Sequence, residues 1–167
     1  TSVDGSSNYL RIETRDSHTK SRWSLACFCT LRLANAMVTE PLPAVNGVIE
    51  TQFYPALAKA GLDYGDNFAL VKSVTIDEMM AQSQLQSISE TDEFMLDPRL
   101  ADAGLHGLFP LIKKMADPDQ PKDRMFLPVG ISRIELFSAK EKVDFARIKL
   151  VTLSPYGASA DIAAMAG

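Results

Sequence analysis

Hydrophobic and polar residues alternate along several short stretches of the chain, which is the pattern of half-buried β-strands. Strands are predicted in this way over 8–16 and 22–34, from Phe68, from about Met79, over 125–138 and over 143–154. The alternation is loosest near Met79, where it is carried by Met80, Ser83, Leu85 and Ser87. These strands surround one longer helical stretch, so the order of elements predicts an α+β fold.

Two stretches have helical features instead. A short helix is predicted over 55–60, with Gly61 as its C-cap. The longer, central helix is expected to begin near Pro98, because Asp97 is a good N-cap and proline suits the first helical position. Pro110 is expected to kink or end this helix, since proline lacks the backbone N–H that an interior position requires.

The central helix separates into two faces when its residues are placed at steps of about 100°. One face holds Leu100, Ala103, Gly104 and Gly107, and the other holds Asp102, Leu105, His106 and Phe109. Two glycines inside a helix cost about 1 kcal/mol each relative to alanine. We therefore expect the glycine face to approach a sheet or a ligand closely. A helix wrapped by a sheet, as in a hot-dog fold, is one geometry that requires such an approach.

The second face carries candidate chemistry. Asp102 and His106 lie about one helical turn apart, among Leu105 and Phe109. A carboxyl group in an apolar pocket has its pKa raised by desolvation, which suits a general acid near neutral pH. A histidine four residues further on can hydrogen-bond that carboxyl group and fix its rotamer. The spacing leaves one alternative open, namely that both residues form an exposed polar stripe, because D-x-x-x-H is a weakly specific pattern.

Composition narrows the class of protein. A chain of 167 residues suits a single domain over 1–167 with a real hydrophobic core. Its net charge of −4 gives no basic footprint, so nucleic acid is not an expected partner. No apolar run approaches the roughly 20 residues that span a bilayer, and the N-terminus lacks the layout of a signal peptide. We therefore expect no membrane partner and a cytoplasmic location.

The sequence predicts no metal or cofactor site. Cys27 and Cys29 share one face of the strand over 22–34 without further ligands nearby, so they are interpreted as core thiols rather than as a zinc site. No glycine-rich phosphate loop and no cluster of metal-ligand residues occurs in the sequence. The chain starts at Thr1 without a methionine, and we expect it to be a piece of a longer polypeptide.

Four segments, in order, resemble the C-terminal half of a polyketide synthase dehydratase domain. FYPALAKAGLDYGDNFALV resembles the family block Y..L...G..YGP.F..L, and LDPRLADAGLHGL resembles hP.LLDaalQ/H, which places Asp102 and His106 on the motif D-x-x-x-Q/H. FLPVGISRIELF resembles the block LP.si..v.l, and FARIKLVTLSPYGASADIAAMAG resembles the closing block a.v......g...aDv.l.d..G. The resemblance runs from about Trp23 to the end and covers most of the chain.

The resemblance implies a fold, a reaction and a site. Dehydratase domains of this family are double hot-dogs with the active site between the halves, so this chain would be the second half. A histidine of the first half removes the α-proton of a β-hydroxyacyl group, which an acyl carrier protein carries on its phosphopantetheine. Asp102 would be the general acid that protonates the departing hydroxyl group, positioned by His106. The implied substrate-binding residues are Tyr64, Gly65, Phe68, Leu105, Phe109 and Pro128.

The chain departs from the family pattern at several positions. The first-half motif H-x-x-x-G-x-x-x-x-P is absent, and the second histidine, His18, lies in the polar turn DSHTK, where we expect it to be solvated. Asp66 replaces the proline after YG, and Ala26 and Cys29 replace the usual His and Gly of W..HA.G. The family pattern also has a final strand after the position of Gly167, which we expect this chain to lack. We therefore expect the chain to need an N-terminal hot-dog half in cis, or a homodimer partner, in addition to the acyl carrier protein and other synthase domains.

Two alternative functions stay open. In the first, the same fold performs neighbouring chemistry on carrier-bound acyl chains, such as double-bond isomerisation, pyran formation by oxa-Michael addition or product-template cyclisation. In the second, the domain is a non-catalytic structural or carrier-docking remnant. Proton transfers of this kind need neither a metal nor a nucleotide, so no cofactor is expected beyond the phosphopantetheine that carries the substrate.

Overall fold

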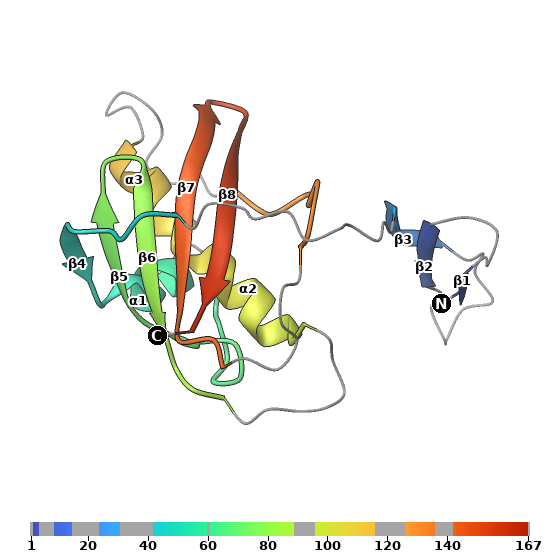
Figure 1. Cartoon of the computed structure of the whole chain (residues 1–167), viewed down its shortest axis with the longest axis horizontal. Coiled ribbons are helices and arrows are strands. Elements are labelled where there is room, and N and C mark those ends of the chain that lie inside the picture. The colour runs from blue at the N-terminus through green and yellow to red at the C-terminus, as the bar shows by residue number, and fades with distance from the viewer. Residues whose placement is uncertain are drawn as a thin grey trace. The chain divides into compact units, whose positions relative to one another are not determined.

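The computed structural model describes residues 2–3, 9–14, 24–30, 42–59, 61–88, 96–115, 126–135 and 142–166 (Figure 1). These residues belong to two compact units, Thr1–Thr39 and Glu40–Gly167. Each unit has an antiparallel sheet of its own, and each is described by itself. The expectation of a single domain over 1–167 therefore stays a prediction.

The first unit is a sheet of order β1-β2-β3, formed by β1 (Ser2–Val3), β2 (Tyr9–Thr14) and β3 (Ser24–Thr30). Leu10 lies opposite Cys29 in the antiparallel pairing of β2 with β3. The strands predicted over 8–16 and 22–34 are thus confirmed in shorter form. The side chains of Cys27 and Cys29 lie outside the described residues, as does His18. The predictions of core thiols and of a solvated histidine therefore stay predictions.

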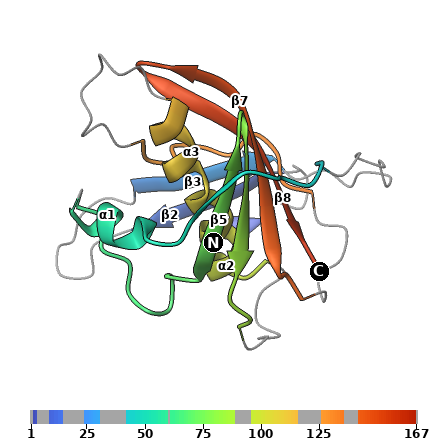
Figure 2. The same ribbon diagram turned by 90° about the vertical axis from the view of Figure 1, so that its left-hand side faces the viewer.

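The second unit holds a five-stranded antiparallel sheet of order β4-β5-β6-β7-β8. Its strands are β4 (Val48–Glu50), β5 (Val71–Asp77), β6 (Met80–Leu85), β7 (Phe145–Ser154) and β8 (Gly157–Met165). The helices α2 (Pro98–His106) and α3 (Leu108–Met115) lie along one face of the sheet, which curves around them (Figures 1 and 2). An antiparallel sheet around a central helix is the α+β hot-dog fold that the sequence predicts.

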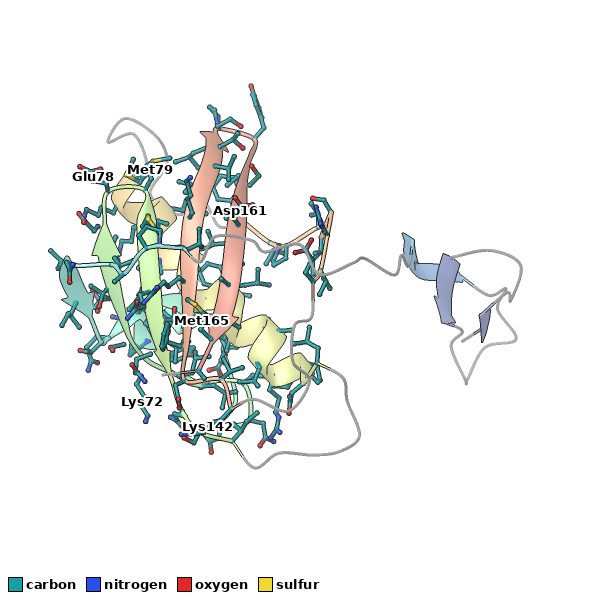
Figure 3. All side chains as sticks on the ribbon, in the orientation of Figure 1. Lys72, Glu78, Met79, Lys142, Asp161 and Met165 are labelled. Atoms are coloured by element: carbon teal, nitrogen blue, oxygen red, sulfur yellow. The ribbon has the colours of Figure 1, made fainter. Side chains whose placement is uncertain are left out.

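Three strands of this five-stranded sheet were predicted, and two, β4 and β8, were missed. The strands predicted from Phe68, from about Met79 and over 143–154 correspond to β5, β6 and β7. β8 was not predicted as a strand, because its alanines and glycine have a weak intrinsic preference for strands. It forms because it pairs with β7 along nearly its whole length, with Asp161 in the middle of the strand (Figure 3).

The alternation predicted for β6 is confirmed in part. Ser83 and Leu85 are buried on one face together with Ala81, whereas Met80 is only half-buried and Ser87 is exposed beyond the end of the strand. The hairpin from β5 to β6 turns at Glu78 and Met79 (Figure 3). Met80 belongs to the first residue pair after this turn, and it lies out of phase with Ser83 and Leu85 because their spacing is odd.

A bulge at the start of β5 changes the direction of its side chains. Val71 lies opposite Leu85 and Ser73 lies opposite Gln84, so Lys72 is an extra residue in the strand. Val71 is buried, whereas Lys72 is exposed near the start of the strand (Figure 3). The bulge matters for the site described below, because it lies next to Val71, whose backbone N–H donates to the hydroxyl group of Tyr54.

The first helix of this unit, α1 (Phe53–Lys59), ends as predicted. Gly61 has a positive φ of 96°, a conformation that favours glycine. Its N–H donates to the carbonyl oxygen of Ala58 at 3.0 Å, and the N–H of Leu62 donates to the carbonyl oxygen of Leu57 at 2.9 Å. These two bonds form a Schellman motif, which confirms Gly61 as the cap.

The start of α2 is also confirmed. The Asp97 carboxylate accepts a hydrogen bond from the backbone N–H of Arg99 at 2.8 Å, and Pro98 occupies the first helical position. The Arg99 guanidinium pairs with the same carboxylate at 2.6 Å and holds the pKa of Asp97 below its ordinary value. No helix in the described ranges is long and apolar enough to cross a membrane.

The central helix breaks at Gly107 and not at Pro110. Gly107 is the C-cap of α2, and α3 begins with the next residue. Pro110 lies in the first turn of α3, where the helix requires no N–H donor and proline is tolerated. A break was therefore predicted correctly, but it was placed too far along the chain because a proline can mark the start of a helix as well as its end.

The strand predicted over 125–138 is wrong for the residues that the structure describes there. Residues 126–135 form no strand, and apolar side chains such as Leu127, Val129 and Ile131 are exposed, Val129 completely so. A strand is stable only when a neighbour satisfies its backbone groups. None of the described strands pairs with this segment, so its alternation lacks the partner on which a strand depends.

The two glycines of the central helix differ in how closely the sheet approaches them. A methyl group added at Gly107 would meet the Cδ1 atom of Ile148 at 2.5 Å and the Oγ atom of Ser83 at 2.6 Å. A methyl group added at Gly104 would meet the Cγ2 atom of Ile162 at an ordinary 3.6 Å. The predicted close approach is therefore confirmed at Gly107, and Gly104 does not require it.

We predict that Gly107→Ala destabilises the fold, because Ile148 and Ser83 are fully buried and leave no room for a methyl group. Overpacking of this kind costs about 1–3 kcal/mol in the free energy of unfolding. Gly104→Ala is the matched control, and its higher helix propensity should stabilise the chain by up to about 1 kcal/mol. Chemical denaturation measures both variants, and equal stability of the two would contradict the packing at Gly107.

Candidate active site

His106 is the last residue of α2, and its side chain is completely buried, with an exposed fraction of 0%. It lies on the buried side of the helix with Ala103 and Gly107, not on the face opposite them as the spacing predicted. The buried arc of α2 is wider than a two-face division allows, because the sheet curves around the helix and covers more than one side of it.

Asp102 binds one nitrogen of this imidazole. The Nε2 atom of His106 lies 3.0 Å from the Oδ2 atom of Asp102, one helical turn away. The Asp102 side chain remains 34% exposed, and among the described residues its Oδ1 atom has no hydrogen-bond partner. Asp102 and His106 are therefore not a shared exposed stripe, since the carboxylate reaches the surface while the imidazole is buried.

Tyr54 binds the other nitrogen. Its hydroxyl group lies 2.9 Å from the Nδ1 atom of His106 and accepts a hydrogen bond from the backbone N–H of Val71 at 3.0 Å. Tyr54 reaches this point from α1, and Val71 lies next to the bulge at the start of β5. Three elements that are distant in the sequence thus converge on one imidazole.

Aromatic rings enclose His106. The ring centroids of Tyr64, Tyr54 and Phe109 lie 4.3, 5.6 and 6.2 Å from that of His106. Burial lowers the pKa of His106 and outweighs the opposing effect of the neighbouring Asp102 carboxylate, which raises it. The imidazole is therefore neutral at neutral pH.

The same burial keeps the nearby phenols protonated. It raises the pKa of Tyr54 to about 12, against the hydrogen bond from Val71, which lowers it. It also raises the pKa of Tyr64, with a further contribution from the charge of Asp102. Tyr54 can therefore accept from Val71 and still donate its own proton to His106.

The hydrogen bonds of His106 can position the carboxyl group of Asp102 as an acid, but they leave the imidazole unsuited to act as a base. Both ring nitrogens of His106 have hydrogen-bond partners, so the imidazole has no free lone pair for a substrate proton. Asp102 has one oxygen bound to His106 and one oxygen without a partner among the described residues. The group best placed to meet a substrate is the free oxygen of Asp102.

The structure brings together only part of the predicted substrate-binding set. Tyr64 and Phe109 contact the His106 ring, and Leu105 is half-buried in the same turn of α2. Gly65, Phe68 and Pro128 are exposed. In the described ranges no ring contact joins Phe68 to His106, and no group of three or more His, Cys, Asp or Glu residues is placed to hold a metal ion.

Sequence reasoning missed Tyr54 and Val71 as members of this site. Tyr54 belongs to the segment FYPALAKAGLDYGDNFALV, yet nothing local to it indicates a hydrogen bond to a residue 52 positions away. Val71 takes part through its backbone, which no side-chain pattern can indicate. The one available signal was the family block Y..L...G..YGP.F..L, whose leading Y falls on Tyr54.

Comparison with known proteins places this fold in a family. Residues 34–165 match the family described as the polyketide synthase dehydratase N-terminal domain. The chain belongs to the polyketide synthase dehydratases. The match begins after Trp23, where the resemblance was expected to start, and it contains the whole described site.

Individual relatives agree with this membership. The chain is 26% identical over 99 residues to the polyketide synthase PksM of Bacillus subtilis (strain 168), which covers 57% of the chain and 2% of PksM. The dehydratase domain of a mycocerosic acid synthase-like polyketide synthase superposes with a TM-score of 0.72 at 16% identity, covering 92% of this chain. The dehydratase domain from the CurJ module of curacin polyketide synthase gives a TM-score of 0.63 at 18% identity, covering 93%.

The dehydratase fold of this chain is shorter than these relatives. The chain spans 57% of each of the two solved domains. The family description names an N-terminal domain, whereas the motif around Asp102 resembles the second half of a double hot-dog. The assignment to the second half therefore stays a prediction.

We predict that this dehydratase chain loses stability as the pH falls below about 6.5, because the pKa of His106 is lowered from its ordinary value of 6.5. Below that pH the unfolded chain binds a proton that the folded chain does not, so the free energy of unfolding falls by at most about 1.4 kcal/mol per pH unit.

His106→Gln removes this titration and is the reference for the measurement. Denaturation of both proteins between about pH 7.5 and about pH 5 gives the difference in their free energies of unfolding. That difference should shrink as the pH falls. An advantage of the wild type that grows in acid would show that His106 gains its proton more readily in the folded chain, contrary to the prediction.

Proposed function

We propose that this chain supplies the acid half of a polyketide synthase dehydratase site, in which Asp102 donates the proton that turns a departing β-hydroxyl group into water. The observation that carries the proposal is the hydrogen-bonded series Tyr54–His106–Asp102, in which the imidazole is completely buried while the Asp102 side chain remains 34% exposed. A carboxyl group held at a fixed rotamer with one free oxygen is what a general acid needs.

The proposed elimination balances as follows. A base breaks the Cα–H bond of a β-hydroxyacyl thioester, and the electron pair of that bond forms the Cα=Cβ double bond. The Cβ–O bond breaks, and the leaving oxygen takes the proton of Asp102. The products are water and an enoyl thioester, and the carboxylate of Asp102 regains its proton before the next cycle. A positioned acid contributes about 10²–10⁴-fold to the rate of such a step.

The base in this proposal comes from outside the described residues. His106 has both ring nitrogens engaged, so we assign it to positioning rather than to proton abstraction. The proposed source is the histidine of an N-terminal hot-dog half supplied in cis, with a base from a homodimer partner as the alternative. The partial exposure of Asp102 supports such a site between two halves, since a second body would cover the carboxyl group and exclude water from it.

The substrate is proposed to arrive on the phosphopantetheine of an acyl carrier protein. Tyr64, Leu105 and Phe109 lie around the buried imidazole or in the adjacent turn, and we assign them to the wall that the acyl chain meets. Gly65, Phe68 and Pro128 are exposed, and we assign them to contacts that form when the second half or the carrier docks.

We predict that Asp102→Asn lowers dehydration by about 10²–10⁴-fold, because the amide has no proton to donate. The substrate is a β-hydroxyacyl-pantetheine, and imidazole is added in increasing concentration as an external base in place of the missing one. Mass spectrometry follows the loss of water. Asp77→Asn is the matched control, since Asp77 is an exposed aspartate at the far end of β5 from Val71.

Equal water loss by the wild type and by Asp102→Asn would contradict the proposed role of Asp102. A second assay with an enoyl-pantetheine substrate distinguishes dehydration from double-bond isomerisation. Migration of the double bond that depends on Asp102, without loss of water from the hydroxy substrate, would assign the acid to an isomerase instead. Water loss without added imidazole would indicate that a homodimer supplies its own base.

A further inference from the structure

We propose that Tyr54 is a positioning residue that fixes the tautomer of His106 and thereby places the transferable proton of Asp102 on its Oδ1 atom. The catalytic consequence rests on the proposed function, whereas the tautomer is a property of the folded chain alone. The hydroxyl group of Tyr54 and the imidazole of His106 make the three hydrogen bonds that determine this tautomer.

The backbone of β5 decides the direction of the first hydrogen bond. An amide N–H can only donate, so the Tyr54 oxygen must accept from Val71. Among the described residues, the one acceptor within reach of the Tyr54 hydroxyl proton is the Nδ1 atom of His106. If that nitrogen carried a proton, the phenol proton would point at a fully buried imidazole without an acceptor there, which is costly.

The direction of the second hydrogen bond follows from the first. A neutral imidazole carries one N–H, and Nδ1 accepts from Tyr54, so the proton of His106 is on Nε2. That N–H donates to the Oδ2 atom of Asp102 at 3.0 Å. The series therefore runs in one direction, from the Val71 amide through Tyr54 and His106 to Asp102.

The last bond determines where Asp102 can carry its own proton. Its Oδ2 atom is occupied as an acceptor, so a proton on the carboxyl group must be on Oδ1, the oxygen without a partner among the described residues. With the opposite tautomer, Nε2 would be a bare acceptor and would take the proton of Asp102 away from the substrate. Tyr54 prevents this loss by keeping Nδ1 occupied.

Tyr54→Phe tests the inference, because it removes the hydroxyl group and keeps the ring that packs against Phe53, Tyr64 and His106. Nitrogen-15 NMR of the full chain, labelled in its histidines, reports which ring nitrogen is protonated. The comparison is made in the Asp102→Asn background, where a neutral amide stands in for the protonated carboxyl group and no carboxylate holds the Nε2–H. The titratable groups facing His106 among the described residues are then Tyr54 and Tyr64 alone.

We expect His106 to be the Nε2–H tautomer at about pH 7, both in the wild type and in the Asp102→Asn chain. Adding Tyr54→Phe should change the ratio of tautomers by about five-fold or more, which corresponds to one lost hydrogen bond. Tyr64→Phe is the matched control, since its ring also contacts His106 but its hydroxyl group makes no hydrogen bond to it in the described structure. It should leave the ratio unchanged.

A protonated Nδ1 in the wild-type chain would overturn the inference, and this measurement needs no variant to fold. An unchanged ratio in Tyr54→Phe, or an equal change in Tyr64→Phe, would overturn it as well. Failure of the proposed function is recognised separately. If Tyr54→Phe shifts the tautomer while Asp102→Asn keeps full turnover, the assignment of Tyr54 to the tautomer stands and Asp102 is not the acid.

Discussion

An imidazole that is shielded from water is stable only when both of its ring nitrogens have partners, and the site depends on how this chain meets that requirement at His106. Tyr54 supplies the donor for one nitrogen and Asp102 the acceptor for the other. The alternative, a protonated ring, is disfavoured because burial lowers the pKa of His106. The orientation of Asp102 is therefore a consequence of a buried group that has no other way to satisfy its hydrogen bonds.

The packing of the hot-dog sets the depth at which this imidazole lies. Gly107 follows His106 directly, and the sheet approaches it so closely that Ile148 and Ser83 occupy the space of a side chain. The bulge in β5 brings the amide of Val71 to the hydroxyl group of Tyr54. Fold and site are thus linked at the end of α2, because Ile148 and Ser83 pack closely against Gly107 and His106 is the residue before it.

Local chemistry allowed much of this fold to be predicted, and long-range chemistry accounts for what was missed. The cap at Asp97 is a bond between near neighbours, so the start of α2 could be read directly from the sequence. The helix break was assigned to Pro110 instead of Gly107, because a proline can mark the start of a helix as well as its end. The strand over 125–138 was wrong because an alternating pattern does not show whether a partner strand is present. The roles of Tyr54 and Val71 were not predicted, because their hydrogen bonds join distant parts of the chain and Val71 takes part only through its backbone N–H. The pairing of Asp102 with His106 was predictable from a motif, but the side on which His106 is buried was not.

Asp102 connects the buried imidazole of His106 with the surface, since its side chain is 34% exposed and its Oδ1 atom has no partner among the described residues. The central claim is that this oxygen meets the β-hydroxyl group of a carrier-bound substrate. A crystal structure of the chain with a non-hydrolysable β-hydroxyacyl-pantetheine amide tests it most directly. We expect the β-hydroxyl oxygen of this ligand to lie within hydrogen-bond distance of the Oδ1 atom of Asp102, with the contact between His106 and Oδ2 preserved. A ligand bound elsewhere on the sheet, or one that displaces His106 from Asp102, would contradict it.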